Sequence, residues 1–114
     1  MEEIRKRIKS GEVDKTVNIE KQNRHIRGTR EYVKGKSYLL DGVDPQGLVD
    51  RYHGTGRAEK AKSGMWTNKE TIIADRNIGV NVSRDTHVET ITNRFTIHYS
   101  NTGTHIVPTN PARR

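Results

Sequence analysis

Hydrophobic residues recur at helical spacing in the first half of the chain. Ile4 and Ile8 are one turn apart in a charged stretch, which predicts a short helix over residues 2–10. Residues 19–27 predict one or two further helical turns. The clearest helix begins after Asp44, a preferred N-cap residue, and the side chains expected to face the core are Leu48, Val49 and Tyr52.

In the second half the spacing changes to the alternation of a β-strand. Apolar residues alternate strictly over residues 78–82, which predicts a half-buried strand. Short strands are also expected at 34–40 and 71–74, whereas the basic stretch 57–69 and the polar stretch 83–93 are expected to form loops. Helical elements followed by a run of antiparallel strands are typical of an α+β fold.

The last two strands, residues 94–100 and 105–109, are expected to form a hairpin with two different faces. One face of the first strand carries Phe95, Ile97 and Tyr99, which belong in the core. The opposite face is polar and consists of Arg94, Thr96, His98 and Ser100. A purely structural strand would equally turn this polar face to solvent.

Apolar pairing across this hairpin predicts its register. If Ser100 pairs with His105, apolar side chains meet on the core face, and Gly103 supplies the left-handed position of the loop. His98 and His105 are then diagonal neighbours on the polar face, roughly 5–8 Å apart. A slip of one residue would move His105 to the buried face.

Two imidazoles at this separation suit general acid–base cleavage of a phosphodiester. Arg94 on the same face is a candidate to neutralise the phosphate. Ser100 and Thr104 are candidates to donate hydrogen bonds to a nonbridging oxygen. The same pattern fits two solvated histidines, so both interpretations stay open.

The charge of the chain adds a candidate partner. Lys and Arg number 21 against 14 Asp and Glu, and the net charge of +7 favours a polyanion such as RNA or DNA. Ordinary solubility or an acidic protein partner explains the same excess. The lack of cysteine excludes disulfides and thiolate chemistry. No apolar run is long enough to span a membrane, and the charged N-terminus is not expected to be a signal peptide.

Four stretches, in this order, resemble the bacterial toxin 50 family, also called polymorphic toxin type 50. They are KQNRHIRGTREY (21–32), GKSYL (35–39), DPQGLVDRYHGTG (44–56) and NRFTIHYSNTGTHIVP (93–108). The resemblance covers roughly residues 18–110. It implies a toxin domain over residues 18–114, with residues 1–17 as an N-terminal helix or linker.

Members of this family lie at the C-terminal ends of bacterial polymorphic toxins and of some phage head proteins, and they are predicted ribonucleases. The resemblance implies N-terminal helices packed on a roughly four-stranded antiparallel sheet, as in barnase, EndoU, colicin nucleases and RelE. It also implies that the ribose 2′-hydroxyl attacks the adjacent phosphate without metal or cofactor. Such an endoribonuclease leaves a cyclic phosphate and cleaves RNA alone.

The resemblance also carries expectations about partners and location. The expected partners are RNA, with tRNA as one candidate, and a cognate immunity protein of acidic character. The domain is expected to be a monomer that does not bind membranes. It would be secreted or delivered within a larger toxin, as in contact-dependent inhibition, and would act in the cytoplasm of the target cell.

Residue by residue, the family pattern falls on the first and last of these stretches. We predict that the catalytic residues are His25, His98, His105 and Thr104. Substrate binding is predicted for Lys21, Gln22, Arg27, Thr29, Arg94, Tyr99 and Ser100. The family pattern does not say which histidine is the base and which the acid.

Other interpretations of the same residues stay open. His25 also fits a packing role beside Ile26, and Trp66 fits either base stacking or a partly buried anchor. His53 is expected to cap a helix or lie at the surface, and His87 to lie in a loop without a role. The histidine spacing does not require zinc. A non-enzymatic module that binds nucleic acid or a capsid would explain the charge but not the paired histidines.

Overall fold

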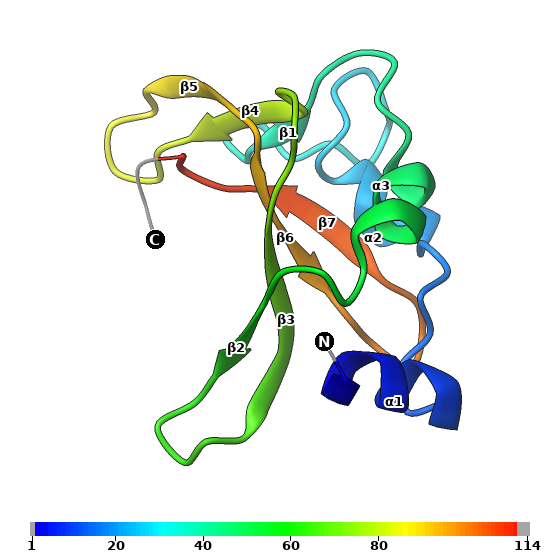
Figure 1. Ribbon diagram of the computed structural model, residues 1–114. Coiled ribbons are helices and arrows are strands. Elements are labelled where there is room, and N and C mark those ends of the chain that lie inside the picture. Colours follow the sequence, from blue (N-terminus) through cyan, green and yellow to red (C-terminus); the bar gives the residue numbers. More distant parts are fainter. Residues whose placement is uncertain (1, 112–114) are drawn as a thin grey trace.

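A computed structural model describes residues 2–111 of the chain, and within them three short helices accompany two antiparallel sheets (Figure 1). The α+β class is therefore confirmed. The helices are α1 (Glu2–Ser10), α2 (Ile19–Asn23) and α3 (Pro45–Tyr52). The strands are β1 (Tyr38–Leu39), β2 (Arg57–Lys60), β3 (Trp66–Ile73), β4 (Gly79–Val82), β5 (Glu89–Thr92), β6 (Arg94–His98) and β7 (His105–Pro108). No helix in the described part is long and apolar enough to cross a bilayer.

The larger sheet has the strand order β2-β3-β6-β7 and two unlike faces. One face carries the core, where fully buried side chains from three strands pack together: Ile72, Phe95, Ile97 and Ile106. Ile4 of α1 and Val49 of α3 are 0% exposed and belong to the same core. Helices α1 and α3 thus pack on the apolar face of the sheet, which leaves its polar face for other contacts.

The smaller sheet has the order β1-β4-β5 and lies against the end of β7. Gly79 permits this contact, because a Cβ atom there would lie 2.5 Å from Cγ of Pro108. Ile78, one residue earlier, is 1% exposed and anchors the strand to the core. The predicted strand over residues 78–82 is confirmed, although Val80 and Val82 are only half-buried.

Local signals at the helix ends account for α2 and α3. The Asp44 carboxylate accepts a hydrogen bond from the amide of Gln46 at 3.1 Å, and Pro45 occupies the first turn, as predicted. In α2 the side chain of Asn18 caps the amide of Lys21 at 3.1 Å. The helix ends at Asn23, so residues 24–27 form turns rather than the continued helix that was expected.

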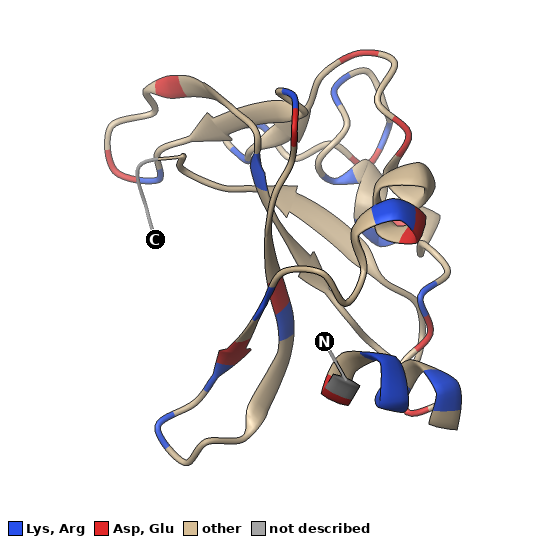
Figure 2. Ribbon diagram, in the orientation of Figure 1, with Lys and Arg blue, Asp and Glu red and all other residues tan. Residues whose placement is uncertain are grey.

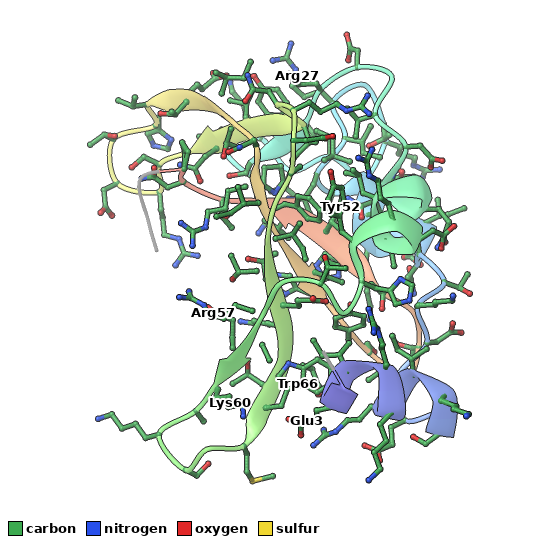
Figure 3. All side chains as sticks on the ribbon, viewed as in Figure 1. Glu3, Arg27, Tyr52, Arg57, Lys60 and Trp66 are labelled. Carbon is green, nitrogen blue, oxygen red and sulfur yellow. The ribbon has the colours of Figure 1, made fainter. Side chains whose placement is uncertain are left out.

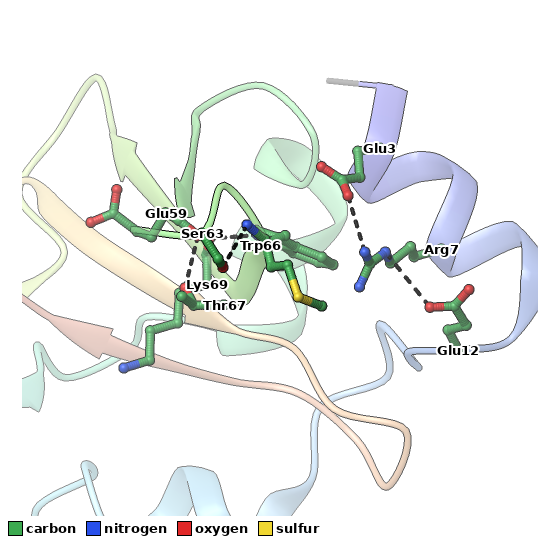
Figure 4. Close-up of polar contacts among 9 residues, drawn as sticks. Glu3, Arg7, Glu12, Glu59, Ser63, Trp66, Thr67 and Lys69 are labelled. Atoms are coloured by element: carbon green, nitrogen blue, oxygen red, sulfur yellow. Dashed lines mark hydrogen bonds and ion pairs between the residues drawn. The ribbon is translucent and has the colours of Figure 1, made fainter. Parts of the chain in front are cut away.

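The prediction of an exposed loop over residues 57–69 is wrong. These residues form β2 and the start of β3, a hairpin that extends away from the rest of the molecule (Figure 1). Trp66 anchors it: the indole is 6% exposed, packs 5.5 Å from the ring of Tyr99 and donates a hydrogen bond to the Lys69 carbonyl at 2.9 Å. The guanidinium of Arg7 lies 5.2 Å from the Trp66 ring centre (Figure 4). The tryptophan is thus a buried anchor and not an exposed surface for stacking.

The polar stretch 83–93 also contains an element that the sequence did not predict. Residues Glu89–Thr92 form β5, which pairs with β4 at the edge of the smaller sheet. Three of its four side chains are exposed, including Ile91 at 55%. Because only Thr92 is buried, the strand lacks the apolar alternation that would have revealed it.

The final hairpin forms, but its predicted register is wrong by two residues. His98 pairs with His105 and Ile97 with Ile106, whereas Ser100 had been expected opposite His105. The N-terminal segment causes the shift, because Ser100 and Thr104 bond to residues of that segment instead of to each other: the Ser100 carbonyl accepts from the amide of Asp14 at 2.8 Å, and the Thr104 amide donates to Thr16 at 2.9 Å. A shift of two residues preserves the predicted faces.

Candidate active site

The register of the last hairpin places His98 and His105 directly opposite one another on the polar face of the larger sheet. Their ring centres are 4.7 Å apart with 28° between the planes. His25, from the turn after α2, stacks on His105 with ring centres 5.9 Å apart and 12° between the planes. We call these three residues the histidine stack. The structure therefore brings together the three histidines that were predicted to be catalytic.

Gln22 fixes the position of α2 beside the sheet. Its side-chain amide donates to the carbonyl of Ile106 at 3.0 Å and accepts from the amide of Ile106 at 2.7 Å. The residue is 1% exposed, so it acts as an extra strand residue on the open edge of β7. His25 follows three residues later, which brings its ring over His105. Gln22 was predicted to bind substrate, and the structure instead gives it this positioning role.

Hydrogen bonds to backbone carbonyls and amides also hold the turn that carries His25. The Thr29 hydroxyl shares its one proton between the carbonyls of Asn23 and Ile26, both at 2.7 Å, and closes the turn. The His25 carbonyl accepts from the amide of Leu39 at 2.9 Å. Thr29 had been predicted to contact substrate, but its hydroxyl is used within the turn.

One hydrogen bond sets the tautomer of His25. Its Nδ1 lies 2.9 Å from the carbonyl oxygen of Ser37. A carbonyl only accepts, so Nδ1 carries the proton and the Nε2 of a neutral ring has a free lone pair. This is the arrangement that a general base requires.

Burial keeps all three imidazoles neutral near pH 7. Desolvation lowers the pKa of His25, an effect that the hydrogen bond to Ser37 partly opposes. Burial, with the charge of Lys69, lowers the pKa of His98 to about 4. Burial and the neighbouring histidines lower the pKa of His105 to about 3. The stack is therefore a set of bases in the absence of an anion.

Four cations surround the stack and contribute to these lowered pKa values: Lys21, Arg24, Lys36 and Lys69. Lys69 of β3 is the cross-strand neighbour of His98, and the ammonium of Lys21 donates to the hydroxyl of Thr102 at 3.0 Å. Within the described residues none of the four forms an ion pair with a carboxylate. Figure 2 shows further basic positions in the loop between α2 and β1. Arg24, Lys36 and Lys69 were missed by sequence reasoning.

Two predicted site residues lie on the other side of the sheet. Thr104 is fully buried, and its hydroxyl donates to the carbonyl of Asp14 at 2.7 Å. The hydroxyl of Tyr99 donates to the buried carboxylate of Glu70 at 2.6 Å, and burial together with this bond raises the pKa of Tyr99. Both hydroxyls are committed to the interior of the fold.

Three further predicted residues lie outside the stack. Arg94 is 7% exposed and lies at the opposite end of β6 from His98. Arg27 donates to the hydroxyl of Tyr38 at 2.9 Å, at the end of the molecule remote from α1 (Figure 3). The hydroxyl of Ser100 lies 3.0 Å from that of Thr102, in the loop that also receives Lys21.

The other histidines lie outside the stack. His53 is the C-cap of α3, with Nδ1 2.8 Å from the carbonyl of Val49, so the prediction of a capping role is confirmed. His87 lies in the turn between β4 and β5. Among residues 2–111, no group of three histidine, aspartate or glutamate side chains is arranged to hold a metal ion.

The arrangement has the chemical groups needed to move protons beside an anion. One imidazole has a fixed tautomer, and the centre of a second ring lies 5.9 Å from it. The surrounding cations form no ion pair among the described residues and can neutralise negative charge. The family model of bacterial toxin 50 matches residues 17–108, a range that includes the whole stack. The comparison with curated proteins gives no match. The chain belongs to the bacterial toxin 50 family.

Proposed function

We propose that this domain is a metal-independent endoribonuclease whose acid–base groups are supplied by the histidine stack. The observation that carries the proposal is the stacking of His25 on His105, with Nδ1 of His25 bonded to the Ser37 carbonyl. One ring is then oriented to accept a proton while its neighbour is close enough to act on the same phosphodiester. The cations around the stack suit a polyanionic substrate.

In the proposed step, Nε2 of His25 takes the proton of the ribose 2′-hydroxyl. The 2′-oxygen then forms a bond to phosphorus while the bond from phosphorus to the 5′-oxygen breaks. The imidazolium of His105 gives its proton to that leaving oxygen. The products are a cyclic phosphate and a 5′-hydroxyl end, and no redox change or cofactor is needed.

The acid in this step must be protonated before it acts. With the site empty, the pKa of His105 is about 3 and the ring is neutral. A bound phosphodiester places a negative charge beside the ring, and an opposite charge raises the pKa of an imidazole. Substrate binding thus favours protonation of the His105 ring. His98 supports the ring of His105 by stacking, and Lys69 neutralises charge on the phosphate.

We extend the same proposal to the biological setting, which membership of a toxin family supports. The domain would be delivered within a larger toxin and act on RNA, tRNA being one candidate, in the cytoplasm of the target cell. An acidic immunity protein would suit the net charge of +7 in the producing cell. We propose that the domain acts as a monomer.

The test is cleavage of bulk RNA and of tRNA by purified protein in buffer with EDTA. The wild type should cleave, and His25→Ala and His105→Ala should each lose at least about 100-fold in rate while still binding RNA. His53→Asn, which changes a histidine outside the stack, is the matched control and should retain activity. Folded wild-type protein that binds RNA without cleaving any of it would contradict the proposal and favour a non-enzymatic module.

A further inference from the structure

A cavity of about 330 Å³ opens directly beside the histidine stack. His25 forms part of its wall, so the cavity and the proposed catalytic site are adjacent. Val107 lies in it as well, on the same face of β7 as His105. We call this space the flanking cavity.

The lining of the flanking cavity is strongly basic. Lys34, Lys36 and Arg84 line it together with His87, and none of the described residues in its lining is acidic. None of the three cations forms an ion pair within the part of the chain that the structure describes. Cations gathered without counter-charges around a hollow attract an anion of matching size.

The turn between β4 and β5 is built to present two of these groups. The Ser83 amide donates to the carbonyl of Val88 at 2.9 Å, and the His87 amide donates to the carbonyl of Ser83 at 2.9 Å. His87 has a φ of 60°, a left-handed backbone conformation that residues other than glycine rarely adopt. Backbone strain of this kind persists where surrounding contacts enforce it, and it is concentrated at binding sites. Here the strained turn places Arg84 and His87 on the wall of one cavity.

A larger hollow continues from the flanking cavity along the end of β7. It measures about 690 Å³ and shares Ser37, Val82, Arg84 and Val107 with the flanking cavity. Asp85 is the one acidic residue in its described lining, which also includes Thr109 and Asn110. The hydroxyl of Thr109 is buried without a hydrogen-bond partner among the described residues. A strand that leaves the stack past Arg84 therefore has room for a further nucleoside.

We infer that the flanking cavity binds the phosphate next to the scissile one on a single-stranded polynucleotide, with Arg84 as its main contact. The inference rests on the proposed function only in taking the stack as the site of the reacting phosphate. The guanidinium of Arg84 has the planar donor geometry that binds phosphate oxygens in pairs. Lys34 and Lys36 add charge without fixed geometry.

The test measures binding of thymidine dinucleotide and trinucleotide, which carry one and two phosphodiesters and lack the 2′-hydroxyl needed for cleavage. Affinities come from NMR titrations at several salt concentrations. The trinucleotide should bind wild type with a salt slope steeper by about 0.7, the value for one additional phosphate contact on a single strand. Arg84→Ala should weaken trinucleotide binding about tenfold and remove this difference, with the dinucleotide unaffected.

Two further variants keep the experiment decisive. Lys9→Ala removes one exposed cation from α1, which lines neither hollow, and should leave both affinities unchanged. Arg84→Gln replaces Arg84→Ala if the alanine variant does not fold. Equal weakening of both ligands, or of neither, would overturn the inference. Binding is measured without cleavage, so the two proposals can fail separately. If the trinucleotide shows the steeper salt slope but the protein cleaves no RNA, the result contradicts the proposed function and leaves the inference standing.

Discussion

Acid should destabilise the fold because the histidine stack must stay neutral inside it. Near pH 7.5 the rings of His98 and His105 are neutral in both the folded and the unfolded chain. As the pH falls below 6.5, the unfolded chain takes up protons, whereas His98 and His105 in the folded protein do so only near pH 4 and pH 3. The stability contributed by these two rings is thus present above pH 6.5 and is lost progressively as the pH falls toward 4.

The size of the effect follows from these pKa values. Each pH unit below 6.5 costs about 1.4 kcal/mol for a ring that stays neutral, so pH 5.0 costs about 2 kcal/mol for each of the two rings. Both side chains are half-buried, and solvent screens part of the cost. Halving the sum for this screening leaves about 2 kcal/mol in total. A loss of that size is a large fraction of the 5–15 kcal/mol typical of a folded domain.

The assay is urea unfolding at pH 7.5 and pH 5.0. The free energy of unfolding of the wild type should fall by about 2 kcal/mol more than that of the double variant His98→Gln/His105→Gln, which lacks these two imidazoles. His87→Asn is the control, because this variant removes an exposed ring and tolerates the left-handed φ, and it should follow the wild type. Equal losses in the wild type and the double variant would refute the reasoning.

Two further predictions concern residues that the sequence assigned to substrate binding. Gln22→Leu should lower the free energy of unfolding, measured by urea denaturation, by about 2–4 kcal/mol, because it leaves the amide and carbonyl of Ile106 unpaired. A loss below about 0.5 kcal/mol would contradict the role of the Gln22 side chain in holding the backbone of Ile106. Tyr99→Phe should cost about 1–2 kcal/mol through its lost bond to Glu70, while RNA cleavage per folded molecule stays unchanged. Full stability with lost cleavage would instead place the Tyr99 hydroxyl in the reaction.

Those parts of the fold that depend on neighbours in sequence could be predicted. The N-cap at Asp44 and the proline after it define the start of α3, and Ile4 and Ile8 define the face of α1. Strict alternation in β6 correctly separated its core face from its polar face. These signals are local, so no knowledge of the tertiary structure was needed.

Elements whose partners are remote in the sequence could not be predicted. β5 has mostly exposed side chains, and Trp66 is the one buried residue within 57–69, so neither stretch shows an apolar period. The hairpin register depends on Asp14 and Thr16, which form hydrogen bonds with residues of the hairpin loop. Asp14 and Thr104, for example, are 90 residues apart in the chain. Nothing in the hairpin itself carries that information.

The residues of the candidate site likewise divide into those that local patterns predict and those that depend on tertiary contacts. The three histidines were found because two share the polar face of a hairpin and the third lies in a recognisable motif. Lys69 was missed because its place beside His98 follows from the pairing of β3 with β6. Ser37, which orients His25, contributes only a backbone carbonyl, a group that every residue type offers. A family pattern marks residues that matter, but it does not separate catalytic groups from those that position them.

The chemistry of the product ends tests the central claim most directly. A defined RNA oligonucleotide and its all-deoxy counterpart would be incubated with the protein in EDTA, and the products identified by mass spectrometry. The account predicts fragments of the RNA that end in a cyclic phosphate, matched by fragments that begin with a 5′-hydroxyl, and no cleavage of the deoxy strand. Cleavage of the deoxy strand, or 5′-phosphate ends from the RNA, would contradict attack by the 2′-hydroxyl at the histidine stack.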